Sequence, residues 1–326
     1  MGRSKWALPP SPEQMSRYGI DTLYFTIPQV IAKQSDILTL LQQHIDPALR
    51  LSDLTINLGT SLYRQCLSVS IHAEDTAEFK PPYRGKQVEL LRVAFDPAPK
   101  SDNKLFGNDT TAFQLKGELL KRIDYLPILR WIIEAGGSVT RVDFFKDDFL
   151  HIIKISDIYQ LCTVGKYQGS VQSPMIKSYL DLYPGENSTY IGSKKGKQVH
   201  IYNKALESGE KFNHTRVELK LRKDNRYQTG LIKAIVGGAN EEQLISSLIG
   251  KYLAFKPFGP GRIHDRAPFP WWIAFLGATS PIKRNQYTPV VTPKPKTLVS
   301  LEEQRSEIMR QLAGLEARIE EQQIRF

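Results

Sequence analysis

Three segments in the second half of the chain alternate between apolar and polar residues, and this alternation limits the fold more than any other feature. The segments are TRVDFF at 140–145, QVHIYNK at 198–204 and TRVELKLR at 215–222. Successive side chains of a strand point to opposite faces, so each segment predicts a strand with one buried face. If the three strands are neighbours in an antiparallel sheet, their apolar sides form one core surface and their polar sides form one site.

The remaining patterns predict an α+β fold, in which helices pack on one face of an antiparallel sheet. Further strands are expected at 20–27 and 86–97, with hairpins at 53–73 and 188–204. Helices are expected at 34–45, 116–137, 156–162 and 229–253, the second of them broken at Pro127, and 258–272 is expected to be a loop.

The predicted domain organisation has one large domain at 19–285. A flexible lead at 1–18 precedes it, and a proline-rich linker at 286–297 and a C-terminal helix at 298–326 follow. The spacing of apolar residues in that helix fits a dimerising coiled coil and a helix packed on its own domain about equally well.

An internal repeat divides the large domain at residue 137. IDTLYF followed by SDILTLL in the first part resembles RVDFFK followed by SDIYQLC in the second. This order predicts two related ββα-type halves, 19–137 and 138–285; a chance match between two α+β stretches is the alternative.

Charge gives the first indication of function, because the chain carries a formal net charge of +10 and a sequence pI near 9.4. Residues 186–226 hold ten Lys and Arg against five Asp and Glu, which is half of the whole excess. A basic protein of this kind often binds nucleic acid. No apolar run is long enough for a membrane span, the first residues do not resemble a secretory signal, and Cys66 and Cys162 lie in apolar runs. The sequence therefore predicts a cytoplasmic protein with two reduced core cysteines and no membrane partner.

The predicted polar face combines residue types that suit phosphodiester chemistry. Carboxylates bind Mg²⁺ or Mn²⁺, Lys and Arg bind phosphate oxygens, and a tyrosine can attack phosphorus to form a covalent link. Cross-strand ion pairs on a solvated sheet face are the structural alternative. The sequence contains no His-x-His pair and no zinc spacing, and GSKKGKQ at 192–198 departs from the phosphate-binding loop of nucleotide hydrolases.

The ordered motifs resemble the replication initiation factor family, the rolling-circle initiators of plasmids, integrative elements and some filamentous phages. The resemblance rests on TRVDFFKDD, TYIGSKKGKQVHIYNKALE and TRVELKLR, with GIDTLYFTI before them and PWWIAFLGA after them, and it covers about residues 19–280. No single motif is specific, but their order is.

The resemblance implies a role for each matched position. Tyr202 is the expected nucleophile and Tyr190 its rival, while Asp143 and Glu218 are the expected ligands of Mg²⁺ or Mn²⁺, with Asp147 or Asp148 as a third. The residues expected to hold DNA are Lys194, Lys195, Lys197, His200, Lys204, Arg216, Lys220 and Arg222.

The resemblance also implies an activity: nicking of origin DNA, single-stranded or supercoiled, with a 5′-phosphotyrosine link and a free 3′ hydroxyl as primer. A host polymerase, a host helicase and a second copy of the chain are the implied partners. Two alternatives stay open from the sequence, a DNA-binding protein of the same fold that does not cut and a conjugative relaxase with the same chemistry.

Overall fold

The computed structural model describes residues 17–28, 34–44, 54–58, 63–72, 87–97, 110–121, 123–168, 177–180, 187–204, 213–259 and 262–277. The chain divides into two units, Met1–Tyr287 and Thr288–Phe326, and every described residue lies in the first. The predicted linker at 286–297, the predicted C-terminal helix at 298–326 and the lead up to residue 16 lie outside the described residues.

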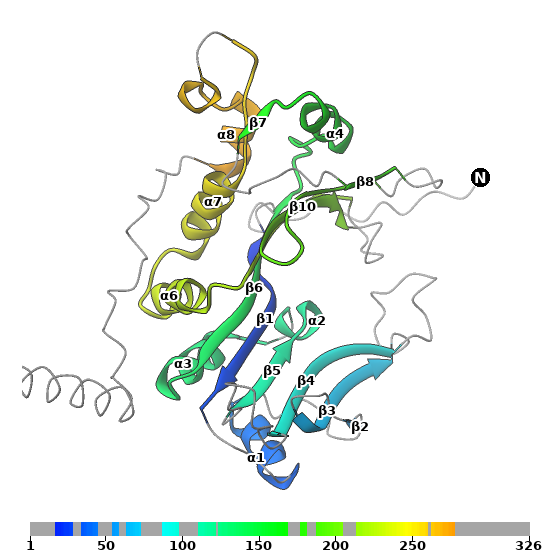
Figure 1. Ribbon diagram of the computed structural model, residues 1–326, viewed down its shortest axis with the longest axis vertical. Coiled ribbons are helices and arrows are strands. Elements are labelled where there is room, and N and C mark those ends of the chain that lie inside the picture. Colours follow the sequence, from blue (N-terminus) through cyan, green and yellow to red (C-terminus); the bar gives the residue numbers. More distant parts are fainter. Residues whose placement is uncertain are drawn as a thin grey trace, which may run out of the picture. The chain divides into compact units, whose positions relative to one another are not determined.

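A ten-stranded antiparallel sheet forms the framework, in the order β2-β3-β4-β5-β1-β6-β11-β10-β9-β8 (Figure 1). Its strands are β1 (Tyr18–Ile27), β2 (Leu54–Leu58), β3 (Tyr63–His72), β4 (Gln87–Pro97), β5 (Thr111–Leu115), β6 (Ser138–Asp148), β8 (Lys177–Leu180), β9 (Asn187–Gly192), β10 (Lys197–Asn203) and β11 (Thr215–Arg222). A separate two-stranded sheet pairs β7 (Tyr167–Gln168) with β12 (Ala254–Phe255).

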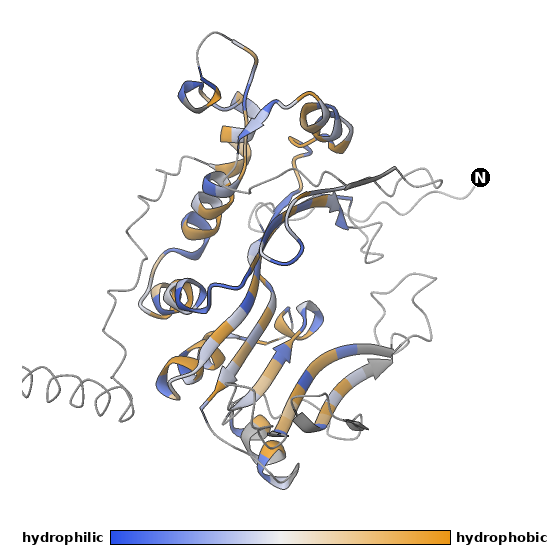
Figure 2. Ribbon diagram, in the orientation of Figure 1, coloured by the Kyte–Doolittle hydropathy of each residue, from blue (hydrophilic) through white to orange (hydrophobic). Residues whose placement is uncertain are grey.

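The alternating segments form neighbouring strands, as predicted. β11 lies between β6 and β10 and pairs antiparallel with both. Val142, Val199, Val217 and Leu219 have no exposed surface, whereas the polar residues between them share the other face. The alternation of hydropathy along the strands is visible in Figure 2. Burial of this apolar side fixes the register, because a slip by one residue would turn the apolar set toward water.

Helices cover the apolar side of the sheet, which confirms the predicted α+β fold. They are α1 (Gln34–His44), α3 (Leu126–Glu134), α4 (Ile155–Thr163), α6 (Asn225–Val236) and α7 (Glu241–Tyr252), and their buried apolar residues belong to the same core as those of the strands. α3 and α6 lie beside β1 and β6 in Figure 1. None of the helices in the described part of the chain combines the length and hydropathy needed to cross a membrane.

The strand order repeats about the central pair of β1 and β6. Outward from this pair, one half runs β1-β5-β4-β3-β2 and the other runs β6-β11-β10-β9-β8. In the described residues, each half begins with its central strand, and a helix, α1 or α4, follows before the outer strands. Each half is thus a five-stranded unit, larger than the ββα unit that the sequence suggested.

The structure differs from the sequence prediction in local detail. Strand β5 and the short strands β7, β8 and β12 were not predicted, and the expected loop at 258–272 contains a 3₁₀ turn, Ile263–Asp265, and the start of α8 (Pro270–Leu276). The helix expected at 116–137 is two helices, α2 (Gly117–Leu120) and α3, and Pro127 stands in the first turn of α3 instead of breaking a helix. This agrees with the preference of proline for the first turn, where its missing N–H costs no hydrogen bond.

Both cysteines lie in the core as predicted. Cys66 and Cys162 are free and buried. Burial raises the pKa of Cys162 to about 12, so its thiol stays protonated at neutral pH.

Candidate functional site

The polar face of β6, β11 and β10 brings residues of β6 together with residues of β10 and β11, which come much later in the chain. Residues that are directly opposite in neighbouring strands project from the same face. The opposed pairs on this face are Tyr202 with Arg216, His200 with Glu218, Lys220 with Asp143, and Arg216 with Asp147. The predicted polar site therefore forms, and it contains two separate groups of contacts.

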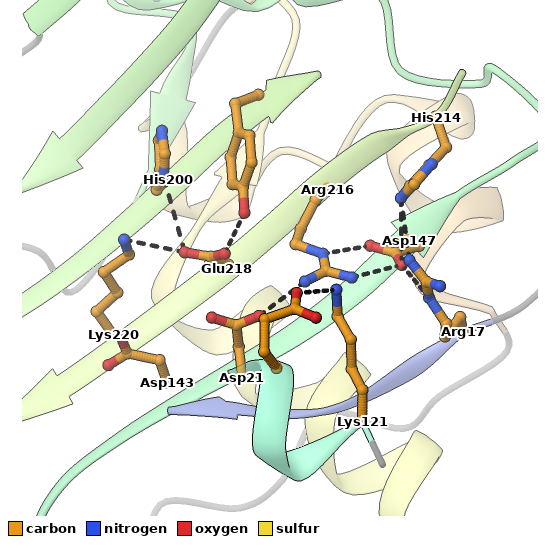
Figure 3. Close-up of polar contacts among 12 residues, drawn as sticks. Arg17, Asp21, Lys121, Asp143, Asp147, His200, His214, Arg216, Glu218 and Lys220 are labelled. Carbon is orange, nitrogen blue, oxygen red and sulfur yellow. Dashed lines mark hydrogen bonds and ion pairs between the residues drawn. The ribbon is translucent and has the colours of Figure 1, made fainter. Parts of the chain in front are cut away.

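The first group, here called the Glu218 cluster, consists of Glu218, Tyr202, His200 and Lys220. The Tyr202 hydroxyl donates a short hydrogen bond to Glu218 Oε1. Lys220 Nζ lies 2.9 Å from Glu218 Oε2, and His200 Nδ1 lies 3.7 Å from the same oxygen. His200 and Lys220 both point toward Glu218 in Figure 3. One carboxylate thus contacts a phenol, an imidazole and an ammonium group.

Glu218 is ionised in this environment. Burial raises the pKa of Glu218, but Lys220, His200 and Arg216 together lower it, and the net result is well below the ordinary value. Burial lowers the pKa of Lys220, but Glu218 and Asp143 together raise it above its ordinary value, so the ammonium stays charged. A buried, ionised carboxylate that accepts a phenolic hydrogen bond is placed to take the phenolic proton.

Three aromatic rings form a continuous stack beside Glu218. The ring centroids of Tyr190 and His200 are 3.8 Å apart with an angle of 8° between the planes, and those of His200 and Tyr202 are 4.1 Å apart at 16°. Both candidate tyrosines therefore flank one histidine. Only Tyr202 has a hydroxyl contact with Glu218 among the described contacts, which distinguishes it from Tyr190.

Asp143 lies on the same face and is held by an arginine from its own strand. Arg141 Nε donates to both carboxylate oxygens, at 2.9 and 3.1 Å, and Arg141 Nη2 makes a shorter contact. Burial raises the pKa of Asp143, and the Arg141 hydrogen bonds oppose this effect. Lys220, the residue opposite Asp143 in β11, also lowers the pKa of Asp143. The Lys220 ammonium therefore stabilises the ionised form of both Asp143 and Glu218.

The second group, here called the Asp147 cluster, consists of Asp147, Arg216, Arg17 and His214. Arg216 binds Asp147 through two hydrogen bonds, Nε–Oδ1 at 2.7 Å and Nη2–Oδ2 at 2.8 Å. Arg17 Nε donates to Asp147 Oδ2 at 2.8 Å and His214 Nε2 lies 3.4 Å from it. Arg17, His214 and Arg216 all point toward Asp147 in Figure 3. Burial raises the pKa of Asp147, but the Arg216 and His214 hydrogen bonds lower it well below its ordinary value.

Arg216, predicted to hold DNA, is occupied within the protein instead. Its side chain has no exposed surface, its guanidinium stacks on the Phe145 ring at 3.9 Å, and Nη1 donates to Asp21 Oδ1 at 2.8 Å. Two carboxylates and a ring satisfy the group, so the geometry favours a structural role. Burial and Glu218 raise the pKa of Asp21 to about 6 against the lowering effect of Arg216.

Neither alternative for the third metal ligand, Asp147 or Asp148, is free to join Asp143 and Glu218. Asp147 is engaged by Arg216, and Asp148 Oδ2 accepts a 2.6 Å hydrogen bond from the Ile153 backbone N–H. Among the described residues, no three His, Cys, Asp or Glu side chains are placed to share a metal ion. Asp143 and Glu218 remain together on the polar face.

The predicted DNA-binding lysines and arginines lie in different surroundings. Lys194 and Lys195 are exposed in the turn between β9 and β10, and Arg222 Nη1 donates to the Lys194 carbonyl. Lys197 lies on the helix side of the sheet, with Nζ 5.0 Å from the centre of the Tyr252 ring. Lys204 is buried, with Nζ 5.6 Å from the centre of the Tyr202 ring.

The sequence prediction missed several residues that complete the site. Arg141 follows the alternation of its strand, so its face was predictable but its partner was not. Asp21 sits where the pairing of β1 with β6 shifts register, and Arg17 just precedes β1. No local pattern signals either contact, because their partners lie more than a hundred residues away in the chain.

Comparisons with known proteins agree with this arrangement. The profile described as replication initiation factor matches residues 137–323, which is more than half of the chain and includes the whole Glu218 cluster and, apart from Arg17, the Asp147 cluster. The fold is similar to that of a rolling circle replication initiator protein from Geobacillus stearothermophilus, with a TM-score of 0.60, 16% sequence identity, and coverage of 80% of this chain and 96% of that chain. A comparison with curated proteins gives no significant match. The matched profile shows that the chain belongs to the replication initiation factor family.

Proposed function

We propose that this protein is a rolling-circle replication initiator that nicks origin DNA with Tyr202 as nucleophile. The observation that carries the proposal is the hydrogen bond from the Tyr202 hydroxyl to the buried, ionised Glu218 within the residues that match the family. A tyrosine needs a base to become a good nucleophile, and Glu218 is in contact with its proton. The similarity in fold to the rolling circle replication initiator protein from Geobacillus stearothermophilus supports the rolling-circle context.

The proposed reaction transfers a phosphodiester from DNA to the protein. Glu218 accepts the phenolic proton, and the Tyr202 oxygen forms a bond to phosphorus. The bond from phosphorus to the 3′ oxygen breaks, and the departing oxygen takes up a proton to become the 3′ hydroxyl. Tyr202 is 4% exposed, so the side chains that cover it move when the phosphate approaches. The 5′ end stays on the protein and the 3′ hydroxyl primes a polymerase.

Lys220 and His200 are proposed to prepare the base and to bind the phosphate. Lys220 holds Glu218 ionised in the free protein, and its side chain is 16% exposed. When Glu218 takes a proton, its attraction for Lys220 falls, and the ammonium group becomes available to a phosphate oxygen. The stack of His200 between Tyr190 and Tyr202 fixes the plane of the nucleophilic ring.

A divalent cation is proposed at Asp143 and at Glu218 Oε2, which leaves Glu218 Oε1 to accept the Tyr202 proton, and the donor chemistry fits. Both supply hard carboxylate oxygens on one face of neighbouring strands, which suits Mg²⁺ or Mn²⁺. Both already attract cations, Arg141 and Lys220. When bound, the metal would polarise a phosphoryl oxygen. Asp147 and Asp148 are left out of this set because Arg216 and the Ile153 N–H engage them.

A nicking assay tests the proposal. Purified protein is mixed with supercoiled DNA that carries its own gene and flanks, with Mn²⁺, Mg²⁺ or a chelator. We expect open-circular product with either metal, no product with the chelator, and loss of product in Tyr202→Phe and Glu218→Gln. Tight binding without nicking, on DNA shown to contain the origin, would favour the binding protein that does not cut. Recruitment of a helicase and formation of a homodimer stay predictions of the sequence.

A further inference from the structure

Six polar residues form a straight row across six neighbouring strands, on the same face as the Glu218 cluster. Each is directly opposite the next in the sheet register: Ser68, Arg92, Gln114, Tyr24, Arg141 and Arg222. Directly opposed residues project from the same side of a sheet, and five strand spacings of about 4.8 Å give a row of about 24 Å. Most of this row lies in the half of the sheet that precedes residue 137.

Apart from the buried Ser68, the row presents hydrogen-bonding groups to solvent. The Arg92 side chain is 44% exposed and that of Arg141 is 21% exposed, while Tyr24, Gln114 and Arg222 are half-buried. The row itself contains no carboxylate. Glu89 lies beside one end, where Glu89 Oε1 accepts from Arg92 Nε at 2.8 Å and from Ser68 Oγ at 3.0 Å.

Three cations, Lys116, Arg141 and Arg222, lie close together at the end of the row nearer the Glu218 cluster. Lys116 Nζ and Arg141 Cζ both lie 4.9 Å from the centre of the Tyr24 ring, and Lys116 Nζ donates to the Tyr24 hydroxyl at 2.7 Å. Arg222 lies opposite Arg141; burial and then Arg141 lower the pKa of Arg222. Four cations in and beside the row, counting Lys116, face two carboxylates, Glu89 and Asp143. Like charges at such spacing repel one another, so an extended anion would be bound favourably.

We propose that this row binds single-stranded DNA that flanks the nicked phosphate, an inference that rests on the proposed nicking function. Arg222 is four residues from Glu218 in β11, about 13 Å along the strand. At that end the exposed Lys194 and Lys195 continue the positive surface. Gln114 and Tyr24 separate the cations of the row, which suits contacts to both bases and phosphates of an unpaired strand, whereas a duplex would meet it through phosphates alone.

Binding of labelled oligo(dT) tests the row without any need for nicking. The probe is about 20 nucleotides long, enough to cover the row and the Glu218 cluster together. All proteins carry Tyr202→Phe and are kept in chelator, so no covalent link can form. The test variants are Arg92→Gln and Gln114→Glu, whose side chains contact no residue of the Glu218 cluster. The control is Arg130→Gln, which removes the same charge from the exposed side of α3, on the helix-covered side of the sheet.

We expect Arg92→Gln to weaken oligo(dT) binding by about threefold to fivefold, as for loss of one exposed ion pair. The slope of log affinity against log salt should fall by about 0.7 for that variant, as for one lost phosphate contact on a single strand. Gln114→Glu should weaken oligo(dT) binding at least as much. Arg130→Gln should change neither the affinity for oligo(dT) nor the salt slope. The proposal is overturned if both test variants behave like Arg130→Gln, or if they weaken binding of oligo(dA)·oligo(dT) duplex as much as binding of the single strand. A protein that fails to nick its origin but shows the expected pattern would refute the nicking function alone.

Discussion

At the scale of single residues, the two clusters of the polar face differ, and we assign the proposed chemistry to one and a structural role to the other. The Glu218 cluster is partly open to solvent through Lys220, and its carboxylate contacts the proposed nucleophile. The Asp147 cluster is closed around Arg216, whose hydrogen-bonding groups are used by carboxylates of the protein. Sequence alternation assigns both sets to one face but does not distinguish their roles, because partner choice depends on three-dimensional distance.

Replacement of Arg216 tests the structural role given to it. Arg216→Met leaves the buried Asp147 carboxylate without its two-point partner, and loss of one partner of a buried ion pair typically costs about 3–5 kcal/mol. Urea unfolding should show a loss of this size, whereas the exposed Arg130→Gln should stay within about 0.5 kcal/mol of the parent. If Arg216→Met kept its stability and lost only DNA binding, the role predicted from the sequence would be right and the structural role wrong.

Asp21 gives a pH dependence of known sign. Its folded pKa is raised from 3.8 to about 6, so between these values the folded state binds more protons than the unfolded state. The contribution of Asp21 to stability is therefore full below about pH 4 and is lost as the pH rises toward about 6. Asp21→Asn should reduce the fall in unfolding free energy between these two pH values. An unchanged pH profile in Asp21→Asn would contradict the raised pKa.

At the scale of elements, the alternation in β6, β10 and β11 predicted the strands, their faces and their adjacency. Apolar and polar residues alternate clearly in these strands, because one face of each strand packs against helices and the other face carries charged side chains. Strand β5 was not predicted because only five residues, TAFQL, carry its pattern. The sequence predicts a loop where α8 begins, because prolines usually interrupt helices. In this case Pro270 occupies the first turn of α8, where proline is tolerated.

The central pair of β1 and β6 joins the two halves of the sheet into one core. Apolar residues from α1 to α8 belong to a single cluster, with Trp131 in the first half and Trp272 in the second. We therefore expect one cooperative unfolding transition. Trp131→Phe leaves Trp271 and Trp272 as reporters of the second half, and the double variant Trp271→Phe/Trp272→Phe leaves Trp131 as the reporter of the first half. The fluorescence midpoint of each variant should coincide with its midpoint by circular dichroism. Separate midpoints within one variant would show that the halves unfold independently.

At the scale of the whole molecule, family membership and charge distribution indicate that the partner is DNA. The geometry of the polar face indicates which side-chain atoms would contact it. The sequence identified Tyr202, Asp143 and Glu218 through motif order, and the structure places all three on one polar face. The sequence alone could not predict the row from Ser68 to Arg222, because the row depends on the register of six strands from both halves of the sheet. A sheet that runs through both halves gives the proposed nick site and the proposed DNA-binding row one common surface.

Mass spectrometry of the protein–DNA link is the most direct test of the proposed nickase. The protein is allowed to react with its origin DNA and Mn²⁺, the DNA is digested, and the residue that carries the phosphate is identified. We predict a phosphodiester on Tyr202 through a DNA 5′ phosphate, absent in Tyr202→Phe and present in Tyr190→Phe. An adduct on Tyr190, or nicked origin DNA with no tyrosine adduct, would contradict Tyr202 as the nucleophile.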